Sequence, residues 1–373
     1  MPMWLQRPLH IGQHLGDLQM VDDNLAQRSF SKQAARQHTL EIRLLQKRQD
    51  RIARLHRIAD AAQGGFGIFR ETYAITSCAS CRICWRCRAC QPQKGDCSYE
   101  NFSAQAPWRK ARIAPAQFFA EQAAQGISCS PIFLCPGFKL GWVCIDVLHC
   151  CDLGVSQKIV GNIFWEAQAI ICEGSTIKAR VEHLQGKLKN YYKYAQPTSK
   201  LDNLTPDMIK APGKGPKLRS KAAECKNSVP FAFQLSVQMA EQDPSEHCKT
   251  MLRMMSALLS YYQMVDSSEF PQEEVAKACR ETCIPFKALR DEARKDSGED
   301  TKLWKLSPKF HMWIESSEFQ SAELGSPRHY WCYRDEDFVG WASQLANSRG
   351  GANTCAHSAL RLIQKYRVWV ASH

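Results

Sequence analysis

The sequence has no long hydrophobic run and no apolar leader. No stretch reaches about 18 consecutive apolar residues, the length that a membrane-spanning helix needs, so we expect no membrane partner. The first residues, MPMWLQRPLHIGQHL, contain neither a continuous apolar core nor a small-residue cleavage site, so we expect a chain that is not secreted. The stretch GKGPK lacks the GxxxxGK[ST] spacing, which excludes that kind of phosphate-binding loop.

Acidic residues are scarce relative to basic ones. The chain has 37 Asp and Glu against 49 Lys and Arg, which gives a net charge of +12 over 373 residues. This excess favours nucleic acid or another polyanion as a partner, although it carries no information about the fold. The hydrophobic content of 44% is that of a folded protein with one large or two ordinary domains.

Composition along the chain predicts three regions. Residues 1–70 are rich in Gln, Arg and His, and the stretch between Thr39 and Ala62 is expected to form a basic helix, either as a solvated face or as a nucleic-acid arm. Residues 71–105 form a cysteine-rich segment and linker, and residues 106–373 have the composition of a folded domain with a basic insertion at about 178–226. We expect the amino-terminal part to be poorly ordered.

The 18 cysteines are the most unusual feature of the composition. Because no signal peptide precedes them, we expect mostly reduced thiols. Cys78, Cys81, Cys84, Cys87 and Cys90 follow one another at a strict interval of three. The pairs Cys78/Cys81 and Cys87/Cys90 offer four thiolates to a zinc ion, but usual zinc modules separate their pairs by a dozen or more residues. A loosely ordered segment and an iron–sulfur cluster are the alternatives.

The stretch 141–173 is the best candidate for a functional centre. The apolar run 143–148 favours a short strand, and Asp146 lies within it, where an unpaired carboxylate costs several kcal/mol. Apolar residues from Val155 to Ile171 recur at helical spacing, and either Ser156 or Asp152 is placed to cap that helix. On spacing alone, His149 fits a structural hydrogen-bonded residue better than a metal ligand.

The basic insertion is predicted either to contact phosphate groups or to form a solvated linker. Pro and Gly residues make its second half a loop, and tyrosines interleave with the lysines of its first half. The residues expected to bind nucleic acid here are Lys187, Lys189, Lys193, Lys214, Lys217, Arg219 and Lys221. Packing helices are expected near Phe118, between Phe231 and Tyr262 and from Glu273 to Lys295, and a strand is expected over Ile132–Cys135.

Three blocks in the second half of the chain form a recognisable pattern. The first contains Asp146, His149 and the pair Leu153-Gly154, the second is the P-K-x-H block with Lys309 and His311, and the third is RDEDFVG at 334–340. In this order they resemble transposase-derived reading frames of the CACTA type, over roughly residues 128–370.

The resemblance implies an RNase H-like sheet that holds two divalent ions, Mg²⁺ or Mn²⁺, for cutting and joining DNA. It assigns catalysis to Asp146, His149 and Glu336, metal binding to Asp146, Glu336 and Asp337, and DNA contact to Lys309 and His311. Such a site needs a further carboxylate from an earlier strand, and the sequence upstream of Asp146 offers none.

We therefore expect an α/β or α+β fold with predominant helix, in which a partial RNase H-like core carries helical additions. The predicted function is that of a nuclear, or otherwise cytoplasmic, DNA-binding protein whose nuclease and strand-transfer activities are lost. The alternative is a zinc-binding protein-interaction module attached to a helical domain.

Overall fold

The computed structural model describes residues 81–136, 139–333 and 364. All but the last belong to one compact unit, Arg57–Gly350, and the description concerns that unit. The predictions for the amino-terminal helix, for Cys78 and for Glu336 and Asp337 lie outside the described residues.

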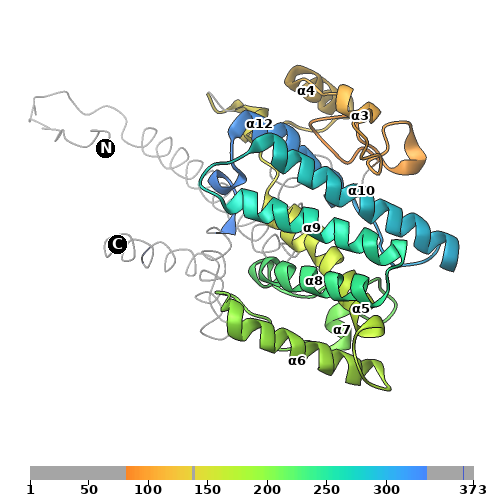
Figure 1. Ribbon diagram of the computed structural model, residues 1–373. Helices are drawn as coiled ribbons and strands as arrows, with labels where there is room; N and C mark the ends of the chain where they lie inside the picture. The colour runs from red at the N-terminus through yellow and green to blue at the C-terminus, as the bar shows by residue number, and fades with distance from the viewer. Residues whose placement is uncertain (1–80, 137–138, 334–363, 365–373) are drawn as a thin grey trace, which may run out of the picture. The chain divides into compact units, whose positions relative to one another are not determined.

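Five long helices form the body of the described part: α5 (Gln157–Ile170), α6 (Ile177–Ala195), α8 (Ala222–Gln242), α9 (Glu246–Asp266) and α10 (Gln272–Ser297). α10 packs on α9, α9 on α8, α8 on α5, and α5 on α6 (Figure 1). The apolar residues of their facing sides, among them Leu184, Leu235, Leu258 and Phe286, are fully buried. The helices predicted between Phe231 and Lys295 are thus confirmed.

Side chains fix where these helices begin. The Thr176 hydroxyl accepts the backbone N–H of Ala179 at the start of α6, and the Ser245 hydroxyl accepts that of Cys248 at the start of α9. Each bond satisfies one of the N–H groups that the first turn of a helix leaves without a partner. α9 therefore begins directly after Ser245, in a polar junction that also contains Pro244.

The predicted strand over 143–148 is wrong. Its residues are irregular up to Asp146, and a π-helix, η5 (Leu148–Ser156), then leads directly into α5. The side-chain amide of Gln320 accepts the N–H of Ile145 at 2.7 Å and donates to its carbonyl at 2.9 Å. The Gln320 side chain thereby satisfies both backbone hydrogen-bonding groups of Ile145, which in a sheet would bond to a neighbouring strand.

No sheet forms among the described residues, whose β-structure is limited to three isolated bridges. Predominant helix is confirmed, whereas an RNase H-like core does not occur in this part of the chain. The predicted strand over Ile132–Cys135 is also wrong, because a 3-10 helix, η3 (Pro131–Leu134), occupies that place. The short helix predicted near Phe118 is confirmed as α4 (Pro115–Ala124).

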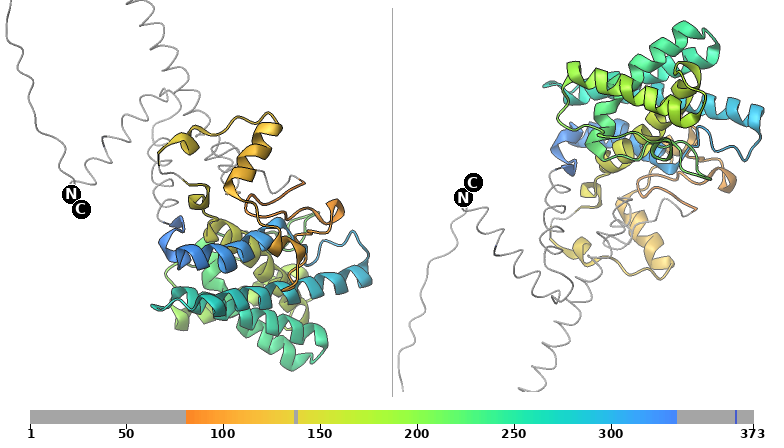
Figure 2. Two further views of the ribbon diagram at one scale, coloured as in Figure 1. Left: turned by 90° about the horizontal axis from the view of Figure 1, so that it is seen from above. Right: turned by 90° about the horizontal axis from the view of Figure 1, so that it is seen from below.

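The described part of the cysteine-rich segment, residues 81–105, is packed into the fold and is not a loose linker. It contains η2 (Pro92–Lys94), and its side chains Ile83, Trp85 and Phe102 are buried, as is Trp108 in the helix that follows, α3 (Pro107–Lys110). In both views of Figure 2 this segment, drawn in orange, lies alongside the blue helices near residue 320. These are α11 (Pro308–Ile314), the π-helix η6 (Glu315–Gln320) and α12 (Ser321–Leu324), and a short 3-10 helix, η7 (Pro327–His329), follows them. A further 3-10 helix, η4 (Leu140–Trp142), precedes the segment that contains Asp146.

The second half of the basic insertion is a loop, as predicted, but it is not a solvated linker. It contains the single turn α7 (Pro206–Ile209), and Leu204, Ile209 and Leu218 are buried against the helical body. The Leu218 N–H donates to the Gln157 carbonyl at 2.7 Å, which joins the loop to the first turn of α5. Apolar side chains in the loop thus anchor the basic ones at the surface.

Candidate functional site

Asp146 and His149 come together where the irregular segment turns into η5. Asp146 Oδ2 lies 2.6 Å from His149 Nδ1 and accepts the backbone N–H of His149 at 3.0 Å. Cys332 joins them, because its backbone N–H donates to Asp146 Oδ1 at 3.0 Å and its thiol to Asp146 Oδ2 at 2.9 Å. Its sulfur also lies 3.4 Å from His149 Nδ1. A carboxylate, an imidazole and a thiol therefore converge on one point.

Electrostatics at this point favour an ionised Asp146. Burial raises the pKa of its carboxyl group, but the hydrogen bonds from His149 and Cys332 outweigh burial and hold the pKa below its usual value. The side chains of Asp146 and His149 remain 14% and 12% exposed, so the group is reached from the surface. The three side chains form a group that can hold a metal ion.

Asp152 does not cap α5, and that prediction is wrong. Asp146 instead accepts the N–H three residues later, as an N-cap residue does. Asp152 is 1% exposed, and its carboxylate oxygens accept hydrogen bonds from the hydroxyl groups of Tyr262 and Tyr333. Burial is the largest influence on its carboxyl group and raises the pKa to about 7 despite those two bonds.

A cluster of four lysines lies beside the same helix. Lys158 comes from α5, Lys217 from the basic loop, Lys305 from the segment before α11, and Lys309 from α11; together they are termed the lysine face. Lys158 Nζ donates to the Lys305 carbonyl at 2.6 Å. Burial, and then the positive charges of Lys217, Lys305 and Lys309, lower the pKa of Lys158 to about 7.

Asn162 holds together the segments that carry the lysine face. Its side-chain oxygen accepts the backbone N–H of Trp304 at 3.0 Å, and its amide nitrogen donates to the Pro216 carbonyl at 3.4 Å. Within the part of the chain that the structure describes, no carboxylate forms a salt bridge with Lys158, Lys217 or Lys305. The charges of these three lysines are thus kept close together without a carboxylate partner among the described residues, which favours an anionic ligand.

The structure separates the other predicted nucleic-acid contacts into two groups. Lys214, Arg219 and Lys221 are exposed on the loop that also carries Lys217. Lys187, Lys189 and Lys193 stand on α6, where Lys187 donates to the Gln238 side chain at 3.4 Å. The α6 lysines are not part of the lysine face.

His311 is not a surface residue, so its predicted contact with nucleic acid is corrected. It is fully buried, and its Nε2 lies 3.3 Å from Cys87 Sγ. Cys84 and Glu315 complete a second group that can hold a metal ion, with ligand atoms within 4.8 Å of one another. All four residues are 0% exposed.

Of the predicted zinc set, Cys78 lies outside the described residues, Cys81 and Cys90 lie near each other, and Cys87 belongs to a different group. Cys87 belongs with Cys84 and His311, whereas the Cys90 thiol faces the Gly95 carbonyl at 3.8 Å, with Cys97 nearby. The reason is a reversal of the chain, in which Arg82 pairs with Cys90 and the Ile83 N–H donates to the Ala89 carbonyl. This turn puts Cys84 and Cys87 at its tip and Cys90 near its open end.

Several site residues were missed by the sequence analysis. Cys84 forms a C-x-x-C pair with Cys87, and Glu315 follows His311 at the i,i+4 spacing of one helical face, so these two missed residues carried a usable signal. Cys332, Lys158, Lys305 and Asn162 carried none, since only the fold brings them to their partners.

Comparison with protein-family models, with curated proteins and with solved structures gives no match. None of the helices in the described ranges is long and apolar enough to cross a membrane.

Proposed function

We propose that this chain is a transposase-derived protein that binds DNA through the lysine face. The observation that carries the proposal is the convergence of Lys158, Lys217, Lys305 and Lys309 from four segments of the chain. A DNA backbone presents closely spaced phosphates, and lysines that neutralise them release condensed counterions. A nuclear location goes with this partner.

The resemblance to CACTA-type transposases gains support from contacts between its blocks. The Lys309 side chain of the second block packs against Gly154 of the first, and its Nζ donates to the Leu153 carbonyl at 3.2 Å. Cys332, two residues before the third block, binds Asp146 of the first. A shared functional surface explains why the first and second blocks, about 150 residues apart in the sequence, lie side by side.

The arrangement of the lysine face also suits a phosphate group. Lys158 is half-buried and held by the Lys305 carbonyl, so its ammonium group is already positioned before any ligand arrives. Burial is the main cause of the low pKa of Lys158, about 7, and a bound phosphate would offset both burial and the weaker repulsion from the neighbouring lysines. Lys214 and Arg219 on the adjoining loop extend the basic surface along a phosphate backbone.

Binding is tested with the double variant Lys158→Gln/Lys305→Gln and a short DNA duplex at about 0.1 M salt. Loss of two phosphate contacts is expected to weaken binding by about 10- to 100-fold. The matched control is Lys249→Gln/Lys277→Gln, which removes the same charge from exposed positions on α9 and α10. Equal affinities of the two double variants would contradict the assignment of the lysine face.

We also propose that nuclease and strand-transfer activity are lost. Two-metal phosphoryl transfer with Mg²⁺ or Mn²⁺ relies on several hard carboxylate ligands, whereas Asp146 is joined here by an imidazole and a thiol. Such a mixed ligand set suits zinc better than magnesium. The pairing of Asp146 with Glu336 or Asp337 stays a prediction.

The loss of activity is tested by incubating supercoiled DNA with the wild-type protein and either Mg²⁺ or Mn²⁺. We expect no cleavage, and the same result with Asp146→Asn. Metal-dependent cleavage by the wild type that Asp146→Asn abolishes would overturn this part of the proposal while leaving the binding result intact.

A further inference from the structure

The tip of the chain reversal at 82–90 has the geometry of a metal-binding knuckle. Cys84 and Cys87 are separated by two residues, and the backbone N–H of Arg86 points at Cys84 Sγ at 3.4 Å. An N–H group aimed at sulfur stabilises the thiolate, which is the form that binds metal. The return arm of the turn is fixed by the Cys87–Arg112 bridge and by the Ile113 N–H bond to the Arg86 carbonyl.

The opposite side of the group comes from the junction of α11 and η6. His311 and Glu315 are four residues apart, so their side chains lie one above the other on the helical face toward the knuckle. The His311 ring is held edge-on against Trp108, with 4.5 Å between ring centroids. His311 Nε2 consequently faces Cys87 Sγ, 224 residues away in the chain.

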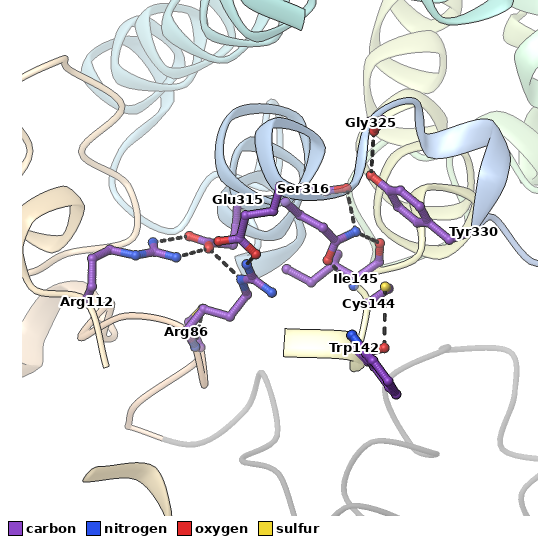
Figure 3. A network of polar contacts seen from close by, with 12 residues as sticks. Arg86, Arg112, Trp142, Cys144, Ile145, Glu315, Ser316, Gly325 and Tyr330 are labelled. Carbon is purple, nitrogen blue, oxygen red and sulfur yellow. Dashed lines mark hydrogen bonds and ion pairs between the residues drawn. The ribbon is translucent and has the colours of Figure 1, made fainter. Parts of the chain in front are cut away.

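Two arginines hold the Glu315 carboxylate in place through hydrogen bonds. Arg112 donates to both of its carboxylate oxygens, and Arg86 Nε donates to Oε1 at 3.1 Å (Figure 3). A carboxylate has about four lone-pair sites, so these three bonds leave one for a metal. Ligating carboxylates in proteins are normally held by such outer hydrogen bonds.

We propose that Cys84, Cys87, His311 and Glu315 bind a zinc ion that fastens the cysteine-rich segment to α11. Two sulfurs, one imidazole nitrogen and one carboxylate oxygen make a closed tetrahedral set of the kind that structural zinc sites use. Binding converts two thiols to thiolates and releases two protons, so the formal charge of this buried group stays unchanged. The site is separate from the lysine face, and its failure would leave the DNA-binding proposal untouched.

The first test is the metal content of the full-length protein purified without chelator. Native mass spectrometry should show about one zinc ion per chain at this site, with a mass increase equal to zinc minus two protons. Cys84→Ser should lose that ion. Cys225→Ser, at another fully buried cysteine, and Cys332→Ser, at the Asp146 group, should keep it.

The second test uses cobalt in the chelated wild-type protein and needs no variant that folds poorly. Co²⁺ should produce the visible bands of a tetrahedral site and a near-ultraviolet thiolate charge-transfer band, and Zn²⁺ should abolish both. Glu315→Gln should weaken metal binding by about 10- to 100-fold. Glu323→Gln, which removes a 2.7 Å ion pair to Arg86 but no ligand, should leave metal binding unchanged.

Three results would each overturn the proposal. These are a wild-type protein that takes up neither Zn²⁺ nor Co²⁺, equal metal loss in Cys84→Ser and Cys225→Ser, and a Cys84–Cys87 disulfide in freshly purified protein, which would indicate redox chemistry in place of metal binding.

Discussion

At the scale of single residues, Asp152 is the clearest case of a side chain that costs stability. Its carboxyl group is buried between Tyr262 and Tyr333, with Lys226 and Asp146 as the charged groups nearest to it. The folded-state pKa of about 7 lies above the value of about 3.9 expected in the unfolded chain. The folded state therefore binds this proton more tightly than the unfolded state does.

This difference sets the sign of a pH dependence. The destabilisation due to Asp152 is absent below about pH 4, grows as the pH rises and is complete above about pH 7. At about 1.4 kcal/mol per pH unit, Asp152 should lower the free energy of unfolding by about 2–3 kcal/mol between pH 5 and pH 8.

Urea unfolding at these two pH values checks the prediction. Asp152→Asn removes the titration and should be less sensitive to pH than the wild type by that amount, whereas the exposed Asp202→Asn should behave like the wild type. An unchanged pH dependence in Asp152→Asn would show that this carboxyl group is ionised in the folded state.

The residues of the sites were only partly predictable from the sequence. Asp146 and His149 are three residues apart, so their pairing was within reach of a local motif. Cys87 and His311 are 224 residues apart, and their contact depends on a chain reversal that no periodicity signals. The strict three-residue cysteine interval predicted a metal site with other partners, because the turn keeps Cys84 and Cys87 together at its tip and places Cys90 near its open end.

At the scale of elements, Gly161 in the middle of α5 determines how closely the basic loop approaches. A Cβ atom at this position would lie 2.5 Å from the Leu218 nitrogen and 2.6 Å from the Lys217 Cα. Any side chain here must push the loop away, since both contacts are with backbone. The position of Lys217 in the lysine face thus depends on the absence of a side chain at Gly161.

Gly161→Ala should therefore displace the loop, destabilise the protein by about 1–3 kcal/mol and weaken DNA binding. Thermal unfolding and duplex affinity measure the two effects. Gly186→Ala on α6 is the control: nothing lies within 4 Å of its Cβ position, and the change should stabilise the helix by about 0.5–1 kcal/mol. Wild-type binding by a folded Gly161→Ala variant would show that the loop does not contribute.

The long helices were predictable because one apolar face repeats along α5, α8, α9 and α10. The apolar run at 143–148 was misread, since a short apolar run fits a strand or a buried irregular segment equally well. What decided between them was Gln320, a side chain 175 residues away that bonds both backbone groups of Ile145.

At the scale of the whole molecule, acidic and basic side chains differ in how far they are paired within the described residues. Many carboxylates are consumed within the fold, as in the ion pairs of Arg109 and Arg280 with Glu318 and of Arg290 with Glu100. The lysine face has no such partners among the described residues for three of its four members. These three lysines therefore keep charge that the described carboxylates do not pair, in a chain whose net charge is +12.

The most direct measurement is the salt dependence of duplex DNA binding by the full-length protein. A plot of the logarithm of affinity against that of salt concentration should be steep for the wild type. It should become shallower by about 3 in the Lys158→Gln/Lys217→Gln/Lys305→Gln variant, since each phosphate contact adds about 0.9 to the slope. A slope that the three substitutions leave unchanged, or no binding by the wild type at low salt, would contradict the account.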